Sequence, residues 1–91
     1  MKLDYKIISF LLRGKRRMAV LSALQKEKMP KQISEELKLS LSNVSLALKE
    51  LRQKKLIECL NPKEKLFKFY SLTKRGKIAI NQLDEYNKRF S

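Results

Sequence analysis

The stretch MPKQISEELKLSLSNVSLALKEL, residues 29–51, decides the fold of this chain. Pro30 stands where a helix can begin at little cost, because the amide that proline lacks would be unpaired in the first turn anyway. A short helix is therefore predicted to start at Pro30 or Lys31. It places Ile33 and Leu37 on the inward side, four residues apart.

A second, longer helix is predicted for about residues 42–54, with Ser40 or Ser42 as its cap. At 3.6 residues per turn, one face is apolar and is expected to enter the core. It consists of Val44, Ala47, Leu48 and Leu51. The opposite face begins with short polar side chains and becomes basic further along. It carries Ser42, Leu46, Lys49 and Gln53, flanked by Asn43, Ser45, Glu50 and Arg52.

Two more helices are predicted before this stretch. Residues 3–12 are apolar on more than one side, and Gly14 is a plausible helix stop. Residues 15–24 follow with apolar side chains at core spacing. The basic run at 13–17 lies at the end of this helix that the dipole disfavours, so something other than local helix stability is expected to retain it.

After residue 55 the apolar period changes from helical to strand-like. Residues 56–60 and 66–72 are predicted strands, joined by the turn sequence Asn-Pro-Lys-Glu-Lys at 61–65. The two strands are expected to form an antiparallel hairpin with Lys63 and Lys65 at its tip.

Thr73 is predicted to cap a final helix over residues 74–90. The expected fold class is therefore mainly α with a small β-hairpin, in one domain over residues 1–91. A domain of this length buries a modest share of its surface, and oligomerisation is one common remedy.

The charge balance indicates the class of partner. The chain has 22 Lys and Arg against 9 Asp and Glu, a formal net charge of +13 and a pI near 10.1. Such an excess opposes compaction, whereas a polyanion converts it into binding free energy through counterion release. A lysine-rich solvated surface is the alternative interpretation, although such surfaces usually carry matching Glu.

Composition also excludes several classes. The chain has no histidine, which removes the usual general base and the commonest metal ligand, so neither an enzyme, a metal site nor a cofactor is expected. Its single cysteine, Cys59, cannot form an intramolecular disulfide and is expected to pack as a small hydrophobe. No apolar run approaches a membrane span, and no signal peptide is recognised at the start.

The order helix, helix, short helix, helix, hairpin, helix resembles the winged helix-turn-helix regulators of the ArsR-type and MarR-type families, archaeal members in particular. The similarity covers about residues 15–80. It is carried by the stretches 29–37 and 39–51, by Lys55-Leu56-Ile57, and by Tyr70-Ser71-Leu72-Thr73-Lys74-Arg75-Gly76. The chain departs from the family pattern at Lys38 and Lys55, where these families often place glycine.

The resemblance implies that the 42–54 helix enters the major groove of DNA with its N-terminus first. The implied base and backbone contacts on it are Ser42, Asn43, Ser45, Leu46, Lys49 and Gln53. Lys31 and Gln32 would clamp phosphate, and Lys63 and Lys65 would reach the flanking minor groove or backbone. Arg16 and Arg17 would add backbone contacts. The plainer alternative makes Ser42 only a cap, Leu46 a scattered surface leucine and Lys63 and Lys65 a solvated turn.

The terminal helices, 3–12 and 74–90, offer more apolar surface than a small winged core needs. Their two apolar stripes either cover each other within one chain or pair across a two-fold axis. A homodimer is expected, because relatives dimerise in this way. The residues assigned to the interface are Leu3, Ile7, Leu11, Ile80, Leu83, Tyr86 and Phe90.

The leading hypothesis is a sequence-specific double-stranded DNA-binding transcriptional regulator, cytoplasmic and nucleoid-associated, with no membrane partner and no small-molecule effector. The alternatives are a winged-helix protein-interaction module and a non-specific chromatin-binding or RNA-binding protein. RNA binding favours exposed aromatic platforms on a sheet. Phe67, Phe69 and Tyr70 fit that description, but aromatic side chains in so small a hairpin are more often core.

Overall fold

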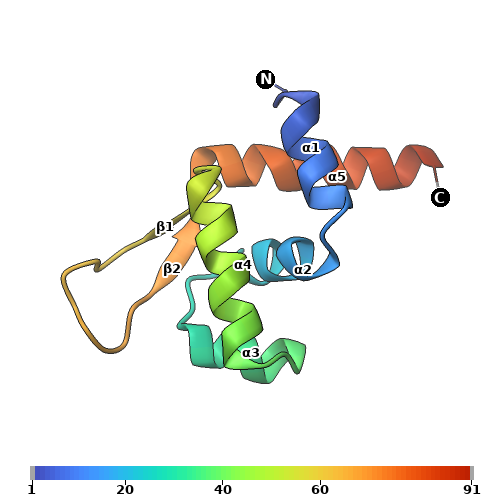
Figure 1. Ribbon diagram of the computed structural model, residues 1–91. Coiled ribbons are helices and arrows are strands. Elements are labelled where there is room, and N and C mark those ends of the chain that lie inside the picture. The colour runs from blue at the N-terminus through green and yellow to red at the C-terminus, as the bar shows by residue number, and fades with distance from the viewer. Residues whose placement is uncertain (1, 91) are drawn as a thin grey trace.

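A computed structural model describes residues 2–90, with only the backbone of Phe90. Within this range the chain forms five helices and one two-stranded antiparallel sheet, the mainly helical fold with a small hairpin that the sequence predicts (Figure 1). The elements are α1 (Tyr5–Leu12), α2 (Lys15–Ala23), α3 (Pro30–Leu37), α4 (Leu41–Gln53), β1 (Ile57–Cys59), β2 (Tyr70–Leu72) and α5 (Lys74–Phe90).

The helix starts follow from side-chain caps. The Ser40 hydroxyl accepts a hydrogen bond from the Asn43 amide at 3.1 Å, so Ser40 rather than Ser42 caps α4. The Thr73 hydroxyl accepts from the Gly76 amide at 3.1 Å and caps α5, as predicted. Each bond satisfies an amide that the first helical turn leaves unpaired.

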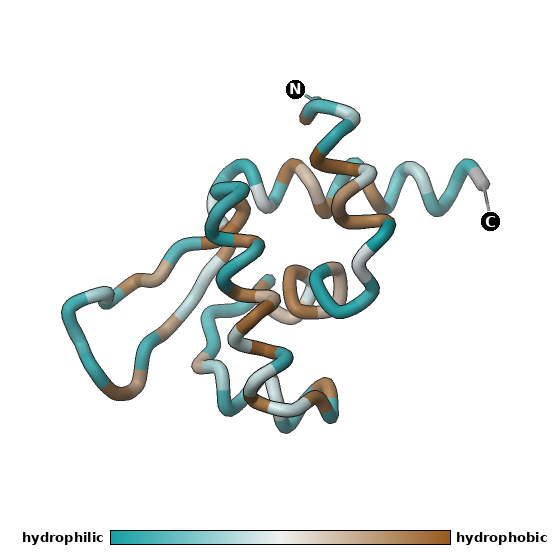
Figure 2. The backbone as a smooth tube through the Cα atoms, in the orientation of Figure 1, coloured by the Kyte–Doolittle hydropathy of each residue, from teal (hydrophilic) through white to brown (hydrophobic). Residues whose placement is uncertain are grey.

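The core is one cluster to which every helix contributes. The four α4 residues predicted to face inward, Val44, Ala47, Leu48 and Leu51, are all buried, at 4% exposure or less. They pack mainly against α2 and α3, and Figure 2 shows the apolar parts of α2 and α4 next to each other. This packing leaves the other face of α4 outside the core.

The terminal helices contribute to the same core. Ile7 and Leu11 of α1 and Leu83 of α5 are 7%, 0% and 4% exposed. These three side chains are therefore core residues of a single chain, whereas the apolar pattern had predicted them at a dimer interface. The two apolar stripes cover each other and the rest of the core, which is one of the two arrangements the sequence left open.

The remaining residues of the predicted interface are less covered. Leu3 and Ile80 are half-buried, and the Leu3 amide donates to Gln82 Oε1 at 2.9 Å. Tyr86 is 43% exposed. The side chain of Phe90 lies outside the described part of the structure.

The sheet is shorter than predicted. Ile57 pairs with Leu72 and Cys59 with Tyr70. Beyond them, one further backbone bond runs from the Leu60 amide to the Phe69 carbonyl at 2.8 Å. On its other side, Tyr70 exchanges two backbone hydrogen bonds with Lys28, at 2.9 and 3.1 Å. The hairpin is thereby tied to the segment that leads into α3.

Residues 66–69, predicted as strand, belong instead to the loop of the hairpin. Phe67 has φ 57°, a left-handed conformation that no strand residue adopts. The Asn61 side chain takes over the pairing: its Nδ2 donates to the Phe67 carbonyl at 3.0 Å, and its Oδ1 accepts from the Phe69 amide at 2.8 Å. A side chain thus replaces the ladder bonds that the apolar run alone suggested.

No helix formed by residues 2–90 is long and apolar enough to cross a membrane. Over the same residues, no three His, Cys, Asp or Glu side chains gather as metal ligands.

Candidate nucleic-acid interface

The outward side of α4 is accessible to solvent. Of the six candidate residues there, five are exposed and Asn43 is half-buried; they are Ser42, Asn43, Ser45, Leu46, Lys49 and Gln53, the outer face of α4. Leu46 is 56% exposed. Short donors and acceptors, one leucine and one lysine therefore lie together on an uncovered helix surface.

The end of α4 is held in place by the beginning of α5. The Thr73 hydroxyl donates to the Lys55 carbonyl at 2.8 Å, and Arg75 Nε donates to the Lys54 carbonyl at 2.9 Å. Gly76 packs so closely that a Cβ there would lie 2.1 Å from the carbonyl oxygen of Leu56. These contacts fix the direction in which α4 presents its outer face.

In each of the two turns that flank α4, a lysine adopts a left-handed backbone conformation. Lys38 ends α3 with φ 56°, and Lys55 follows α4 with φ 60°. Both are positions where the resemblance leads one to expect glycine, and each costs about 1–2 kcal/mol relative to a right-handed conformation. The chain keeps the turn geometry despite the substitutions.

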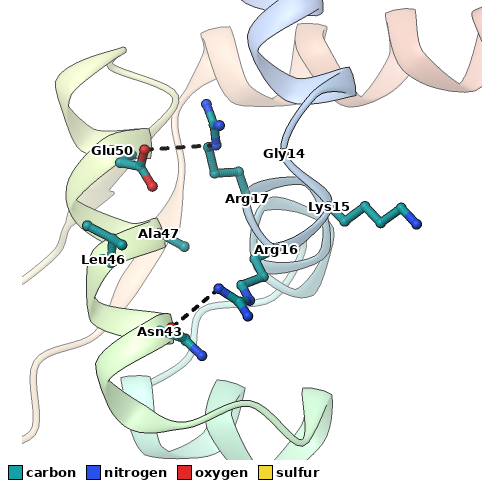
Figure 3. Close-up of a pocket in the computed structure, with 8 residues that line it drawn as sticks. All are labelled: Gly14, Lys15, Arg16, Arg17, Asn43, Leu46, Ala47 and Glu50. Atoms are coloured by element: carbon teal, nitrogen blue, oxygen red, sulfur yellow. Dashed lines mark hydrogen bonds and ion pairs between the residues drawn. The ribbon is translucent and has the colours of Figure 1, made fainter.

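A shallow pocket of about 320 Å³ separates the start of α2 from α4 (Figure 3). Arg16 Nη1 reaches Asn43 Oδ1 at 3.5 Å, whereas Arg17 Nε lies 4.0 Å from Glu50 Oε2. Lys15 points away from α4. The basic start of α2 thus supplies one guanidinium at the outer face of α4 and another that neutralises an acid beside it.

The second guanidinium also packs against an aromatic ring. Arg17 lies 4.0 Å from the centroid of the Phe10 ring, and Lys54 Nζ lies 5.3 Å from the same ring. The Arg17 side chain is 24% exposed. Of the two arginines, Arg16 is therefore the more accessible, and Arg17 links α1 to α4.

The hairpin loop carries Lys63 and Lys65, both exposed. Next to them, Leu66 and Phe67 are each 71% exposed. The expectation that the hairpin aromatics are core is correct for Tyr70, which is 8% exposed, and wrong for Phe67. Phe67 has a left-handed backbone, and its side chain is exposed instead of packing in the core.

Comparison with solved structures identifies the architecture, although no family model and no curated protein matches the chain. NMB1585, a MarR family regulator from Neisseria meningitidis, shares 28% identity over 93% of this chain and 62% of its own, with a TM-score of 0.74. TubR bound to 24 bp of tubC, from Bacillus thuringiensis serovar israelensis pBtoxis, gives a TM-score of 0.78 at 15% identity, covering 94% of this chain and 98% of its own.

A third structure is the homodimeric winged helix-turn-helix DNA-binding domain of Mb0332 from Mycobacterium bovis, a possible ArsR-family transcriptional regulator. It matches with a TM-score of 0.73 at 19% identity, over 90% of this chain and 77% of its own. The fold is a winged helix-turn-helix. The predicted resemblance to MarR-type and ArsR-type regulators is confirmed by these structural neighbours.

The chain spans less than two thirds of NMB1585 and little more than half of some other matched regulators. In the winged-helix fold, α3 and α4 correspond to the helix-turn-helix, α4 has the position of the recognition helix, and residues 57–72 form the wing. Lys31 and Gln32 lie exposed at the start of α3. Gln32 Oε1 accepts from the Met29 amide at 2.8 Å, so this side chain already caps its own helix.

An apolar groove between the wing and the helix-turn-helix was not predicted from the sequence. Leu41, Leu66 and Phe67 contribute to it, together with Lys68. Leu41 is the first residue of the recognition helix and is 53% exposed. The sequence does place two large apolar residues, Leu66 and Phe67, directly after a lysine-rich turn. They were interpreted as part of a strand.

Proposed function

We propose that this protein is a sequence-specific double-stranded DNA-binding transcriptional regulator that acts as a homodimer. The observation that carries the proposal is the uncovered outer face of the recognition helix, in a winged helix-turn-helix chain of net charge +13. Among its structural neighbours, NMB1585 is a MarR family regulator, Mb0332 is a possible ArsR-family transcriptional regulator, and TubR was solved bound to 24 bp of tubC. We assign no catalytic residue, cofactor or effector to this protein.

The recognition helix supplies base readout. Ser42, Asn43 and Ser45 offer short donors and acceptors to base edges in the major groove, and Leu46 offers an apolar surface to a thymine methyl group. Lys49 and Gln53, further along the same face, bind the backbone. Arg16 orients the Asn43 amide through its 3.5 Å contact.

Other residues anchor the protein without reading sequence. Lys31 and the first amides of α3 bind phosphate, since a helix N-terminus favours an anion, and Gln32 supports them by closing that first turn. Lys63 and Lys65 of the wing bind the flanking backbone or minor groove. Arg16 adds a phosphate contact. Arg17 contributes indirectly, because it lies 4.0 Å from the Glu50 carboxylate and offsets its negative charge.

Dimerisation would use the apolar surface that remains on the terminal helices. Tyr5 and Leu12 of α1 and Tyr86 of α5 are 81%, 37% and 43% exposed. The Mb0332 domain is homodimeric. Two recognition helices related by a two-fold axis would read half-sites about 34 Å apart, one duplex turn. We place this activity in the cytoplasm, at the nucleoid.

A salt-titrated binding assay on duplexes selected from genomic fragments tests the proposal. We expect fragments retained far above non-specific background, with affinity falling steeply as salt rises. Retention of all fragments alike would favour the non-specific alternative, and no retention would favour a protein-interaction module.

Variants separate readout from anchoring. Lys63→Ala and Lys65→Ala should each reduce the salt slope by about one without changing the selected sequence. Asn43→Ala and Leu46→Ala should relax the sequence preference and leave most of the slope. Lys88→Ala, an exposed lysine near the end of α5, removes the same charge away from the proposed interface and serves as the control. If all four variants behave alike, the assignment of roles is wrong.

A further inference from the structure

The wing and the helix-turn-helix enclose an open groove of about 410 Å³. Its apolar walls include Leu41 from the recognition helix and Leu66 and Phe67 from the wing. Lys31, Lys65 and Lys68 also line it, and none of its described lining residues is acidic. The groove therefore combines an apolar surface with positive charge.

Its apolar side chains form a patch rather than isolated exposures. Single surface leucines are ordinary in soluble proteins. Here two adjacent large residues are each 71% exposed, and Leu41, exposed by 53%, lines the same groove. A contiguous exposed patch of this kind in a strongly charged chain points to a binding role.

The wing loop is held in one conformation. The Asn61 side chain stabilises the loop by hydrogen bonding to the backbone of Phe67 and of Phe69, at 3.0 and 2.8 Å. Phe67 is thereby kept in a left-handed conformation that bulky side chains avoid. Both Asn61 bonds go to backbone atoms, so the loop conformation that exposes the Phe67 ring does not depend on contacts made by the ring.

We propose that Leu66 and Phe67, next to the lysines of the wing loop, insert into the minor groove of bound DNA as an apolar wedge. This rests on the proposed function, because the groove is continuous with the candidate DNA interface: Leu41 begins the recognition helix and Lys31 lies in the first turn of α3. The phosphate backbone between the major and minor grooves passes between these elements and the wing, where the three lysines match its charge. An acidic peptide would match the charge equally but has no reason to lie beside the recognition helix.

Three physical consequences follow. Apolar side chains that enter the minor groove partly unstack a base step and bend the duplex toward the major groove. The wedge contributes binding free energy that does not depend on counterion release, so it should not alter the salt slope. It should also favour flexible pyrimidine–purine steps at the flank of the site.

Phe67→Asn tests the wedge with little risk to the fold. Asparagine tolerates the left-handed conformation, and the Asn61 bonds to the backbone are retained. The measurement uses a duplex selected for wild-type binding and labelled at both ends, which gives affinity at several salt concentrations and the end-to-end distance by energy transfer. We expect about tenfold weaker binding at every salt concentration, an unchanged slope and loss of the bend, with a melting temperature no lower than that of the wild type.

Leu60→Asn is the matched control, because Leu60 is 46% exposed on the same hairpin and does not line the groove. It should bind and bend DNA as the wild type does. Leu66→Ser provides a second variant of the wedge and should behave like Phe67→Asn. Lys65→Ala should instead lower the salt slope.

The inference is overturned if both wedge variants bind and bend the duplex as the wild type does, while Lys65→Ala still reduces the slope; DNA binding would then stand and the groove would be left for an acidic peptide. It is also overturned if the wild type binds tightly without bending. Failure of the wild type to bind any duplex would instead refute the proposed function itself, a result distinct from the other two.

Discussion

Two lysines occupy backbone conformations that normally favour glycine. Lys55 is left-handed at the exit of the recognition helix, and the fold tolerates it because Thr73 bonds to its carbonyl. Lys55→Gly should raise the free energy of unfolding by about 0.5–1 kcal/mol, since relief of the strain exceeds the added freedom of the unfolded chain. Urea unfolding followed by circular dichroism measures this change.

The neighbouring Lys54 is the matched control, because it adopts φ −89°. Lys54→Gly relieves no strain and should lower stability by about 0.5–1 kcal/mol. Equal effects of the two substitutions would contradict the argument from left-handed geometry.

Gly76 is required by a close approach rather than by its own φ. A Cβ would lie 2.1 Å from the Leu56 carbonyl oxygen, a backbone atom fixed by its bond from the Thr73 amide. Gly76→Ala should therefore destabilise the protein by about 2 kcal/mol or more, as overpacking does. Thermal unfolding measures it.

Gly14→Ala provides the comparison for that prediction. The three atoms nearest to its added Cβ all belong to the guanidinium of Arg17, a side chain that can shift at the cost of its contacts with Phe10 and Glu50. A small effect is expected at Gly14 and a large one at Gly76. A small effect at both would mean that α5 shifts freely relative to the recognition helix.

At the scale of elements, helical periodicity predicted the recognition helix well. Its inward residues are buried, its outward residues are accessible, and Ser40 caps it. This works because a long amphipathic helix repeats its pattern over several turns. The wing was predicted less well, since the run at 66–72 looks like a strand while a single side chain, Asn61, decides its conformation. Consequently the exposed Leu66 and Phe67 were not foreseen.

The acid on the recognition helix gives a prediction at this scale. Glu50 lies 4.0 Å from Arg17 and is the acid that lines the pocket between α2 and α4. Glu50→Gln removes negative charge from the proposed DNA-binding side, so DNA binding should tighten at low salt and the salt slope should increase. The pair is partly exposed, with side chains 24% and 35% accessible, and at 4.0 Å it contributes little to folding, about 0–1 kcal/mol.

Glu85→Gln, an exposed acid on α5, is the charge-matched control and should leave the slope nearly unchanged. The same binding titration, run on both variants, decides the point. Equal effects would indicate that net charge, rather than the position of the charge, governs affinity.

At the scale of the whole molecule, the sequence does not distinguish burial within one chain from burial between two. The sequence is compatible with either arrangement for Ile7, Leu11 and Leu83. In the structure these side chains are buried in the core of one chain. The spacing of apolar residues indicates that a helix face is buried, but it does not indicate which element or chain covers that face. The net charge of +13 likewise indicates a polyanionic partner without locating the surface that binds it.

The remaining apolar surface on the terminal helices is small, and like charges on two protomers oppose their association. A homodimer therefore needs Tyr5, which is 81% exposed on α1, and the exposed part of Tyr86 on α5. Tyr5→Arg adds a further charge at this surface and should shift the protein from dimer toward monomer, as measured by sedimentation equilibrium over a range of concentrations and salt. Leu60→Arg adds the same charge on the hairpin and should leave the dimer intact. Because only a dimer engages two half-sites at once, Tyr5→Arg should also lose affinity for a palindromic duplex while retaining that for a single half-site; a monomeric wild type that binds palindromes no better than half-sites would refute the dimer.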